Sequence, residues 1–479
     1  MTLLASPSGA GGAGGPEGHA MPRESSAARS LRTSRPRRPA WPLDALLLLF
    51  PLWWVLGLGT LIFPLLAVPM ALQLRRRPRV TAPPGFGIWL LFLVSIVVSW
   101  TLLGTDPEGT LAGTIVGRLP TVALAAVEYL AVTVVLLYAY NLTEREYPQY
   151  RLVRSLGVLF LVTVLGGYLG LVAPTLQLTS PVELLLPDWV RSNLYVRSLV
   201  HPAAAQLQAV FGYSTPRPAA PFGYTNTWGN NLSVLLPWFV VGFVVWRKAR
   251  HRVIAGLVVA FAIVPAIYSL NRGLWIGLAI SAVYVAVRTA WHGRLAASGL
   301  LCIAVMLALL VATATPLTTV FSQRLDNGQS DRVRAFTTEQ TLRVAAQSPV
   351  LGFGSTRSAV GSAQSIAVGK SQLCQRCGNP TLGSNGQIWA VLMGQGYTGV
   401  LLYSGFFLYG IARFRRDRTP IGYAGVLVLM LALISMFYYN ALVSPLCFYL
   451  LAYALLARNE RLRQQAGTVG AGTGAGDGS

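Results

Sequence analysis

Long apolar stretches, separated by short polar connections, dominate the pattern of hydrophobic and polar residues along this chain. Most of them approach the roughly 20 residues that a helix needs to cross the hydrocarbon core of a bilayer. They predict an all-α, polytopic integral membrane protein with about 12 transmembrane helices. The first two stretches form one run that is interrupted at Gly57-Leu58-Gly59, where we expect a hairpin of two short helices. The apolar stretches cover approximately residues 43–57, 58–74, 86–104, 120–141, 155–173, 227–246, 253–270, 273–288, 297–315, 386–411, 420–438 and 441–457.

Clusters of arginine predict the side of the membrane on which each connection lies. Cytoplasmic loops carry an excess of lysine and arginine. With the basic N-terminal region placed inside, every even-numbered connection contains arginine, and Arg458, Arg461 and Arg463 also fall inside. We therefore expect a multi-pass protein of the bacterial cytoplasmic membrane with both termini in the cytoplasm. The even-numbered connections are residues 75–77, 144–154, 247–252, 288–294 and 413–418.

The composition agrees with burial in a bilayer. Hydrophobic residues make up 53% of the chain and charged residues only 11%, whereas soluble proteins average about 25% charged residues. The net charge of +22 comes from the arginine clusters between apolar stretches, so we expect a lipid partner for these charges and no nucleic acid. Residues 1–40 and 464–479 are expected to be disordered tails, the first of them basic and cytoplasmic, on either side of a transmembrane domain at 41–463.

Two of the external connections, at about 174–226 and about 316–385, are much longer than the others. Loops longer than about 15 residues are usually functional or disordered. The first contains Arg217, Tyr224 and Asn226 directly before an apolar stretch. Arginine can grip phosphate through two hydrogen bonds, and amides and aromatic rings suit sugars, so these residues are candidates for binding an anionic glycan. The alternative is an aromatic belt at the membrane interface with turn-forming residues.

Further arginines lie at or near the same predicted face. Arg272 is nearly alone between two apolar stretches, where it either binds a ligand or extends to the outer interface. Arg332 and Arg334 begin a predicted amphipathic helix at 331–347, and they face either lipid headgroups or a diphosphate substrate. Ser384 and Asn385 end the second long connection.

Other ionisable and sulfur-containing residues give weaker indications. Glu128 lies within an apolar stretch and is either a proton relay or the partner of a buried arginine. His201 is the one histidine on the predicted outer face, and it is either a general base or a turn residue before Pro202. Cys374 and Cys377 are expected to form a small structural disulfide, because neither a zinc site nor a thioredoxin-like context accompanies them. We expect no metal and no cofactor.

An ordered set of short motifs on this face resembles the superfamily of O-antigen ligases and O-antigen polymerases. The set begins with Arg-Pro and Pro-Phe-Gly-Tyr-Thr-Asn, followed by Ser-Leu-Asn-Arg-Gly-Leu-Trp between two apolar stretches. The set is completed by Asp-Arg-Val-Arg, Ser-Pro-Val-Leu-Gly-Phe-Gly, Asn-Gly and Gly-Gln-Gly-Tyr-Thr-Gly. These motifs lie at 217–226, 269–275, 331–334, 348–354, 385–386 and 394–399.

The resemblance implies a fold like that of type-C glycosyltransferases and a metal-independent glycosyl transfer outside the cytoplasm. The donor would be a glycan on a polyprenyl (undecaprenyl) diphosphate, and a sugar hydroxyl of a glycan or glycolipid would be the acceptor. Arg217 and Arg272 match the arginines that hold the diphosphate leaving group, with Arg332 and Arg334 as weaker candidates. Such a reaction would make surface polysaccharide of the cell envelope, as a polymerase or a ligase.

One departure from the family pattern concerns the general base. The ligases of the family carry histidine immediately before the asparagine of the last motif, where this chain has Ser384. Either His201 or an acid serves instead, or the reaction needs little base assistance; the candidate acids are Glu183, Asp188 and Asp331. This departure favours a polymerase or a divergent transferase over a ligase. The alternative function is a transporter or flippase for a lipid-linked or anionic substrate.

Overall fold

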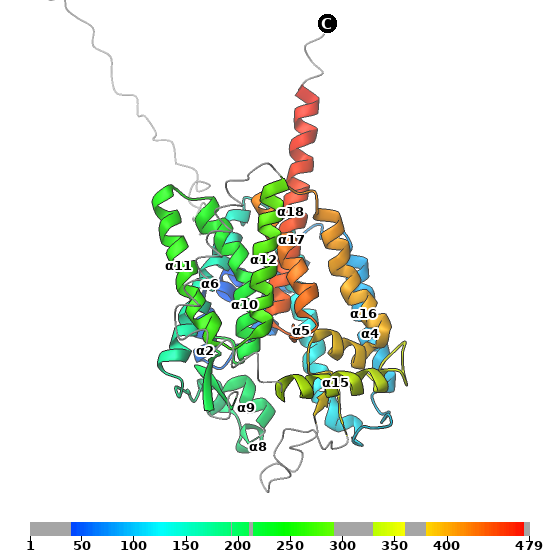
Figure 1. The fold of residues 1–479 in the computed structure, drawn as a ribbon. Coiled ribbons are helices and arrows are strands. Elements are labelled where there is room, and N and C mark those ends of the chain that lie inside the picture. Colours follow the sequence, from blue (N-terminus) through cyan, green and yellow to red (C-terminus); the bar gives the residue numbers. More distant parts are fainter. Residues whose placement is uncertain (1–39, 193, 210–213, 292–328, 360–379, 474–479) are drawn as a thin grey trace, which may run out of the picture. The chain divides into compact units, whose positions relative to one another are not determined.

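The computed structural model describes residues 40–192, 194–209, 214–291, 329–359 and 380–473, which are mostly helical (Figure 1). The first half contains α1 (Trp41–Leu48), α2 (Phe50–Val55), α3 (Ile62–Arg75), α4 (Phe86–Ser99), η2 (Trp100–Leu102), α5 (Ile115–Asn141), α6 (Gln149–Val172), α7 (Pro181–Leu185), α8 (Asp188–Arg191) and α9 (Leu194–Val200). The β1 (Ala205–Ala209) and β2 (Ser214–Pro218) strands follow. The second half contains α10 (Thr225–Phe239), η3 (Val240–Val245), α11 (Ala249–Tyr268), α12 (Arg272–Trp291), α15 (Gln329–Ala345), β3 (Arg357–Ser358), β4 (Thr381–Leu382), α16 (Gln387–Phe414), α17 (Pro420–Ser435) and α18 (Ser444–Thr473).

Several of these helices are suited to a membrane. Among the described residues, six have the length and apolar composition to cross a bilayer: α5, α6, α10 with η3, α11, α12 and α16. The apolar helices α3, α4 with η2, and α17 are shorter. This confirms the expectation of an all-α protein with the character of a membrane protein. Each apolar stretch within the described residues contains helix, whereas the stretch 297–315 lies outside them.

The chain turns where the hairpin of two short helices was expected, but the part before the turn is divided into α1 and α2. The chain leaves α2 at Val55 and begins α3 at Ile62. Gly57 has a φ of +79°, a left-handed conformation that favours glycine, and a Cβ there would lie 2.2 Å from Oγ of Ser180. The turn is therefore packed directly against the segment that begins α7.

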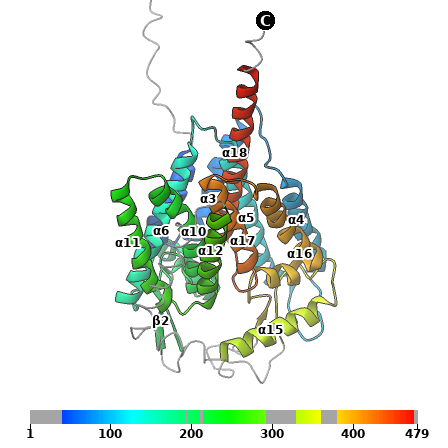
Figure 2. The same ribbon diagram turned by 45° about the horizontal axis from the view of Figure 1, so that its top comes forward.

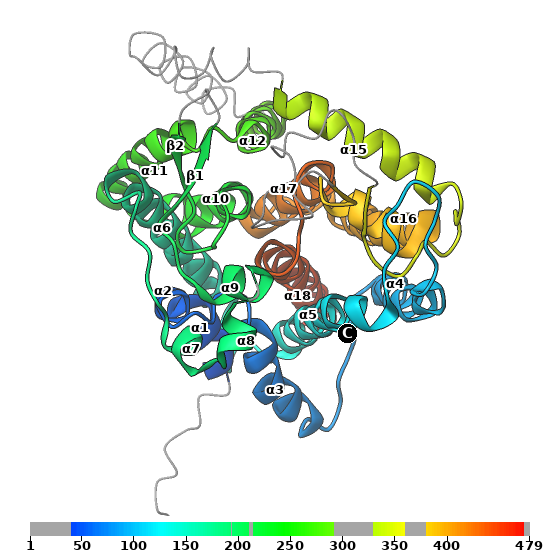
Figure 3. The same ribbon diagram turned by 90° about the horizontal axis from the view of Figure 1, so that it is seen from below.

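The centre of the bundle is formed by α18, which lies between α5, α10 and α17 when the bundle is viewed along its length (Figure 3). Residues 446–456 of this helix are completely buried, as expected for a helix that is apolar all round. Cys447 belongs to this buried stretch as a free thiol. The same helix continues to Thr473 and so extends into the segment 464–479 that was expected to be a disordered tail.

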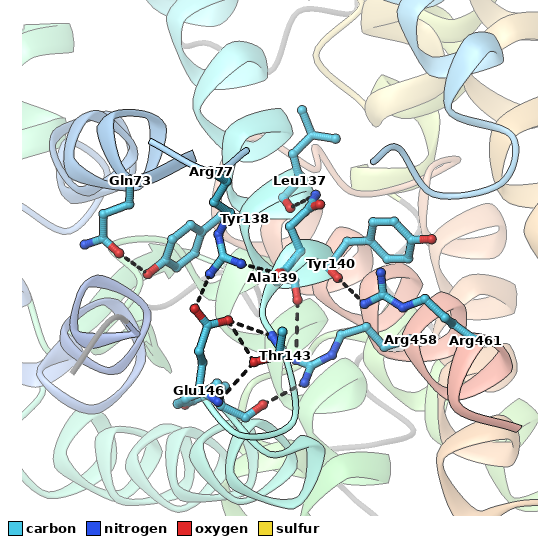
Figure 4. A network of polar contacts seen from close by, with 12 residues as sticks. Gln73, Arg77, Leu137, Tyr138, Ala139, Tyr140, Thr143, Glu146, Arg458 and Arg461 are labelled. Atoms are coloured by element: carbon cyan, nitrogen blue, oxygen red, sulfur yellow. Dashed lines mark hydrogen bonds and ion pairs between the residues drawn. The ribbon is translucent and has the colours of Figure 1, made fainter. Parts of the chain in front are cut away.

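Several of the arginine-rich connections meet at one end of the bundle, which we call the basic end. Figure 4 shows the part of this network around Arg77, Glu146 and Arg458. Its ion pairs join distant parts of the chain, because their partners come from different connections. Arg458 is almost fully buried and donates to the carbonyl oxygens of Ala139 and Tyr147. The ion pairs of the basic end are Asp44–Arg151 at 2.5 Å, Arg77–Glu146 at 2.8 Å, Glu144–Arg458 at 2.6 Å, Arg413–Glu460 at 3.1 Å and Asp417–Arg463 at 3.3 Å.

The two long connections lie together at the opposite end (Figures 1 and 2). The first contributes α7, α8, α9 and an antiparallel β1–β2 hairpin, in which Gln206 pairs with Arg217. The second contributes α15, which lies across the ends of neighbouring helices and packs against α16. This helix is the amphipathic helix expected at 331–347, with slightly earlier bounds. Both connections therefore contribute to one face of the bundle.

Candidate functional site

A cavity of about 730 Å³ opens between the two long connections and the helices beneath them. Its lining combines residues from segments that are far apart in the sequence. Seven of the residues proposed from the sequence for catalysis or substrate binding line it: His201, Arg217, Tyr224, Asn226, Arg334, Ser384 and Asn385. The cavity thus collects cations, amides and aromatic rings at one place, which is the arrangement that an anionic, sugar-bearing ligand requires.

Arg217 is held in position by the β1–β2 hairpin and by the residue that ends α11. Its side chain is 7% exposed, and Nε donates to the carbonyl oxygen of Ser269 at 2.7 Å. The hydroxyl of Thr225 donates to the carbonyl oxygen of Arg217 at 3.2 Å, and the Thr225 N–H donates to Oε1 of Gln206 at 2.8 Å. The motifs at 217–226 and 269–275 are therefore neighbours in the fold, although some fifty residues separate Arg217 from Ser269.

Arg272 begins α12 beside this arrangement, but it is not among the residues that line the cavity. The preceding Asn271 donates to the carbonyl oxygen of Thr225 at 3.3 Å and accepts from the hydroxyl of Tyr439. The following Gly273 faces the ring of Tyr438, and a Cβ at this position would lie 2.5 Å from the ring. The fold therefore fixes the backbone of Arg272 closely from both sides.

His201 has a carboxylate partner that the sequence pattern alone does not pair with it. Its Nδ1 lies 2.7 Å from Oε2 of Glu183, and its Nε2 lies 3.3 Å from Oε1 of Gln177. The Glu183 side chain is 5% exposed, and its other carboxylate oxygen lies 3.8 Å from Nε of Arg197. Glu183 was one of three acids considered as a base. In the structure its carboxylate instead contacts Nδ1 of His201.

Asn385 holds α15 in place, and both Asn385 and Ser384 line the cavity. The Asn385 side chain donates to the carbonyl oxygen of Arg334 at 3.1 Å and to the hydroxyl of Thr337. The hydroxyl of Ser384 donates to the carbonyl oxygen of Thr381 at 2.6 Å. Arg334 reaches from α15 toward the carbonyl oxygen of Tyr438 at 3.5 Å. The Asn-Gly motif thus positions the helix that carries Arg334.

Glu128 also lines the cavity, from the α5 side. Its side chain is 8% exposed, and within the described part of the chain it has neither an ion pair nor a hydrogen-bond partner. It is therefore not paired with any described arginine, which was one of the two roles considered for it. A carboxyl group buried without a partner is costly unless it is protonated or a ligand satisfies it.

Part of the cavity wall is apolar, and the sequence pattern did not single out these apolar residues. Phe50, Trp54, Ile96, Trp100 and Val122 come from α2, α4, η2 and α5. They belong to ordinary apolar stretches, where no local signal separates a cavity-lining side chain from one that faces lipid or core. The cavity therefore combines polar residues of the two long connections with apolar residues of the helices, to which Glu128 and Gln387 add polar groups.

The other predicted site residues lie outside what the structure describes. The side chain of Arg332, and the segment that contains Cys374 and Cys377, are not among the described residues. Within the described ranges, no group of three or more His, Cys, Asp and Glu side chains is placed to hold a metal ion. No protein-family model and no curated protein matches this chain.

Proposed function

We propose that this protein transfers a glycan from a polyprenyl-diphosphate carrier to a sugar hydroxyl at the outer face of the cytoplasmic membrane. The observation that carries the proposal is the single cavity lined by Arg217 and Arg334 on its polar side and by tryptophans on its apolar side. A glycan linked to a polyprenyl diphosphate consists of an anionic diphosphate, an apolar hydrocarbon chain and a hydroxyl-rich sugar. The cationic, apolar and amide-bearing residues of the cavity suit these three parts. The acceptor would be a glycan or glycolipid that enters from the aqueous side.

The cations of the cavity would act mainly on the leaving group. When the bond between the anomeric carbon and the phosphate oxygen breaks, negative charge grows on the diphosphate. Guanidinium groups fixed by the fold stabilise that charge without having to reorganise, which lowers the barrier. Arg217 would contact the diphosphate directly, with Arg334 beside it. Arg272 stays a predicted member of this group, and its place at the start of α12 puts it next to the segment that fixes Arg217.

The orientation of the cavity follows from the two ends of the bundle. We propose that the basic end faces the cytoplasm, as loops rich in arginine do, so that the cavity opens on the outer side. Twelve crossings remain the count that we favour. Arg288, near the end of α12, donates to the carbonyl oxygen of Arg415 at the basic end, whereas Arg334 of α15 lies at the cavity.

Binding of the carrier lipid provides the first test. Undecaprenyl diphosphate, added to the purified full-length protein in detergent, is the probe, and native mass spectrometry measures the complex. We expect Arg217→Ala to weaken binding by about 10- to 100-fold, because removing a charge-assisted contact costs about 1.5–3 kcal/mol. Arg343→Ala is the matched control, since Arg343 is exposed on α15 and pairs only with Glu339 among the described residues.

Transfer itself is measured with lipid-linked glycans extracted from a strain that lacks the protein. Longer or newly linked glycan, together with released polyprenyl diphosphate, is the expected product. Equal binding by wild type and Arg217→Ala would contradict the proposed role of the cavity. The second candidate, a transporter or flippase, is favoured by the carboxyl group of Glu128, which lies in a membrane-type helix and has no partner among the described residues. It predicts movement of the lipid across reconstituted vesicles with no new glycosidic bond.

A further inference from the structure

We propose that Glu183 is a positioning residue for His201, and that the pair accepts the proton of the attacking sugar hydroxyl. This inference rests on the proposed glycosyl transfer and names the group that replaces the histidine absent at Ser384. It depends on three observations: the way in which α7 is held against α9, the contacts of both ring nitrogens, and the position of His201 in the cavity lining.

The fold holds Glu183 rigidly. Ser180 precedes α7, and its hydroxyl accepts from the N–H of Glu183 at 3.1 Å while it donates to the carbonyl oxygen of Val200 at 2.6 Å. The serine therefore joins the first turn of α7 to the end of α9, the residue directly before His201. A side chain fixed by such neighbours loses little freedom when it forms a further contact, so the carboxylate is prepared to orient the imidazole.

The contact with the Glu183 carboxylate determines which ring nitrogen of His201 can accept a proton. At 2.7 Å from Oε2 of Glu183, Nδ1 carries the hydrogen and donates it, because an ionised carboxylate only accepts. A neutral ring with its hydrogen on Nδ1 has its lone pair on Nε2. Hydrogen bonding to the other nitrogen is the general way in which proteins set the tautomer of a functional histidine.

The structure also provides a hydrogen-bond acceptor for Nε2 of His201 when the imidazole ring is protonated. Nε2 lies 3.3 Å from Oε1 of Gln177, which can accept a hydrogen bond once Nε2 has taken a proton. In that state both N–H groups of the imidazolium have oxygen acceptors, one of them a carboxylate that offsets the positive charge. The surroundings of His201 therefore suit the form that the ring takes immediately after accepting a proton.

The step is balanced as follows. The hydroxyl oxygen of the acceptor sugar forms a bond to the anomeric carbon of the donor, and the bond from that carbon to the phosphate oxygen breaks. The electron pair of the broken bond leaves on the polyprenyl diphosphate. The hydroxyl proton moves to Nε2 of His201, and it is released to water or to the diphosphate after the product departs.

The other acids are less suited to this role. Asp188 is exposed on α8 and pairs with Arg191. Glu128 lines the same cavity but has no contact with His201 among the described residues. The side chain of Asp331 lies outside the described residues. Glu183 is thus the acid that the structure places in contact with the candidate base.

Glu183→Gln tests the inference, because it keeps the shape and a hydrogen-bond acceptor but removes the charge. With the purified full-length protein and glycans extracted from the deficient strain, we expect kcat to fall about 10- to 100-fold while the KM for the donor is unchanged. His201→Asn should reduce kcat by at least about 100-fold, the usual range for losing a general base. The double variant should be no slower than His201→Asn alone, since residues that act as a unit are not additive. Asp188→Asn, an exposed acid of the same connection, should keep wild-type kcat.

Two outcomes separate failure of this inference from failure of the proposed function. Wild-type kcat in Glu183→Gln, with transfer still lost in Arg217→Ala, would overturn the positioning role and leave glycosyl transfer standing. An absence of transfer by the wild-type protein would remove the proposed function itself. A purely structural role of Glu183 would appear as an additive loss in the double variant, or as lost binding of undecaprenyl diphosphate by Glu183→Gln.

Discussion

Arg357 shows how a single buried cation can organise the end of the bundle at which the two long connections lie. The residue is 3% exposed, and its guanidinium donates to the carbonyl oxygen of Phe353 at 2.9 Å and to those of Leu103 and Thr105 at 3.2 and 3.1 Å. Burial lowers the pKa of Arg357 to about 10, which still leaves the side chain charged at neutral pH. The arginine therefore joins the connection after α4 to the Gly-Phe-Gly turn that packs against α16.

Replacing this arginine, which does not itself line the cavity, should destabilise the protein. We expect Arg357→Ala to lower the free energy of unfolding by about 2–4 kcal/mol, because several buried carbonyl groups lose their donor at once. Thermal unfolding of the purified protein, followed by intrinsic fluorescence, measures the change. Arg191→Ala serves as the control, since Arg191 is exposed and pairs with Asp188. An unchanged melting temperature in Arg357→Ala would contradict the structural role.

At the scale of elements, α15 is a polar helix that is positioned by its neighbours. Asn385 donates to the Arg334 carbonyl oxygen near its first turns, and the N–H of Gly383 donates to Oγ1 of Thr341 at 3.2 Å near its middle. On the same side, Val344 and Ala345 are buried. Contacts with the segment before α16 therefore determine where this helix lies, and with it the position of Arg334 in the cavity lining.

Loss of these contacts should loosen the helix locally. In Asn385→Ala, we expect faster amide hydrogen exchange in residues 329–345, because local opening is easiest where few tertiary contacts remain. Exchange elsewhere should be unchanged. Glu339→Gln is the control on the same helix, since the exposed Glu339 pairs only with Arg343 among the described residues. Identical protection of α15 in Asn385→Ala and wild type would show that Asn385 does not position it.

At the scale of the whole bundle, charge and cavity lie at opposite ends. The ion pairs of the basic end join the connections 75–77, 144–154 and 413–418 to the first helix and the last helix. The long connections gather at the other end, around the cavity. A bilayer that surrounds the apolar helices would separate these two ends. The orientation of the protein in the membrane therefore decides on which side of the bilayer the cavity opens.

Labelling from outside the cell tests this orientation. In a background without native cysteines, a membrane-impermeant maleimide should react with Asp188→Cys, on exposed α8, and not with Arg250→Cys, at the start of α11. Both positions are exposed, so access from the outer side, and not burial, decides the result. Labelling of Arg250→Cys with protection of Asp188→Cys would reverse the topology and place the cavity in the cytoplasm.

The sequence by itself determined the class of fold, because the length and apolar composition of a helix are local properties. Its apolar stretches located the helices, its arginine clusters anticipated which connections meet at the basic end, and its polar motifs indicated seven residues that line one cavity. The extent of α18 beyond residue 464 was missed, since its low-complexity segment resembles a disordered tail.

Only the tertiary structure decided which residues act together. Several contacts join segments that no local sequence pattern connects. They are the pairing of Glu183 with His201, the hydrogen bond from Arg217 to Ser269, and the apolar part of the cavity wall with Trp54 and Trp100. Burial of Glu128 without a described partner is likewise a property of the packed bundle. The physical reason is that hydrogen bonds and cavities depend on distances in space, and these are set by the packing of all the helices together.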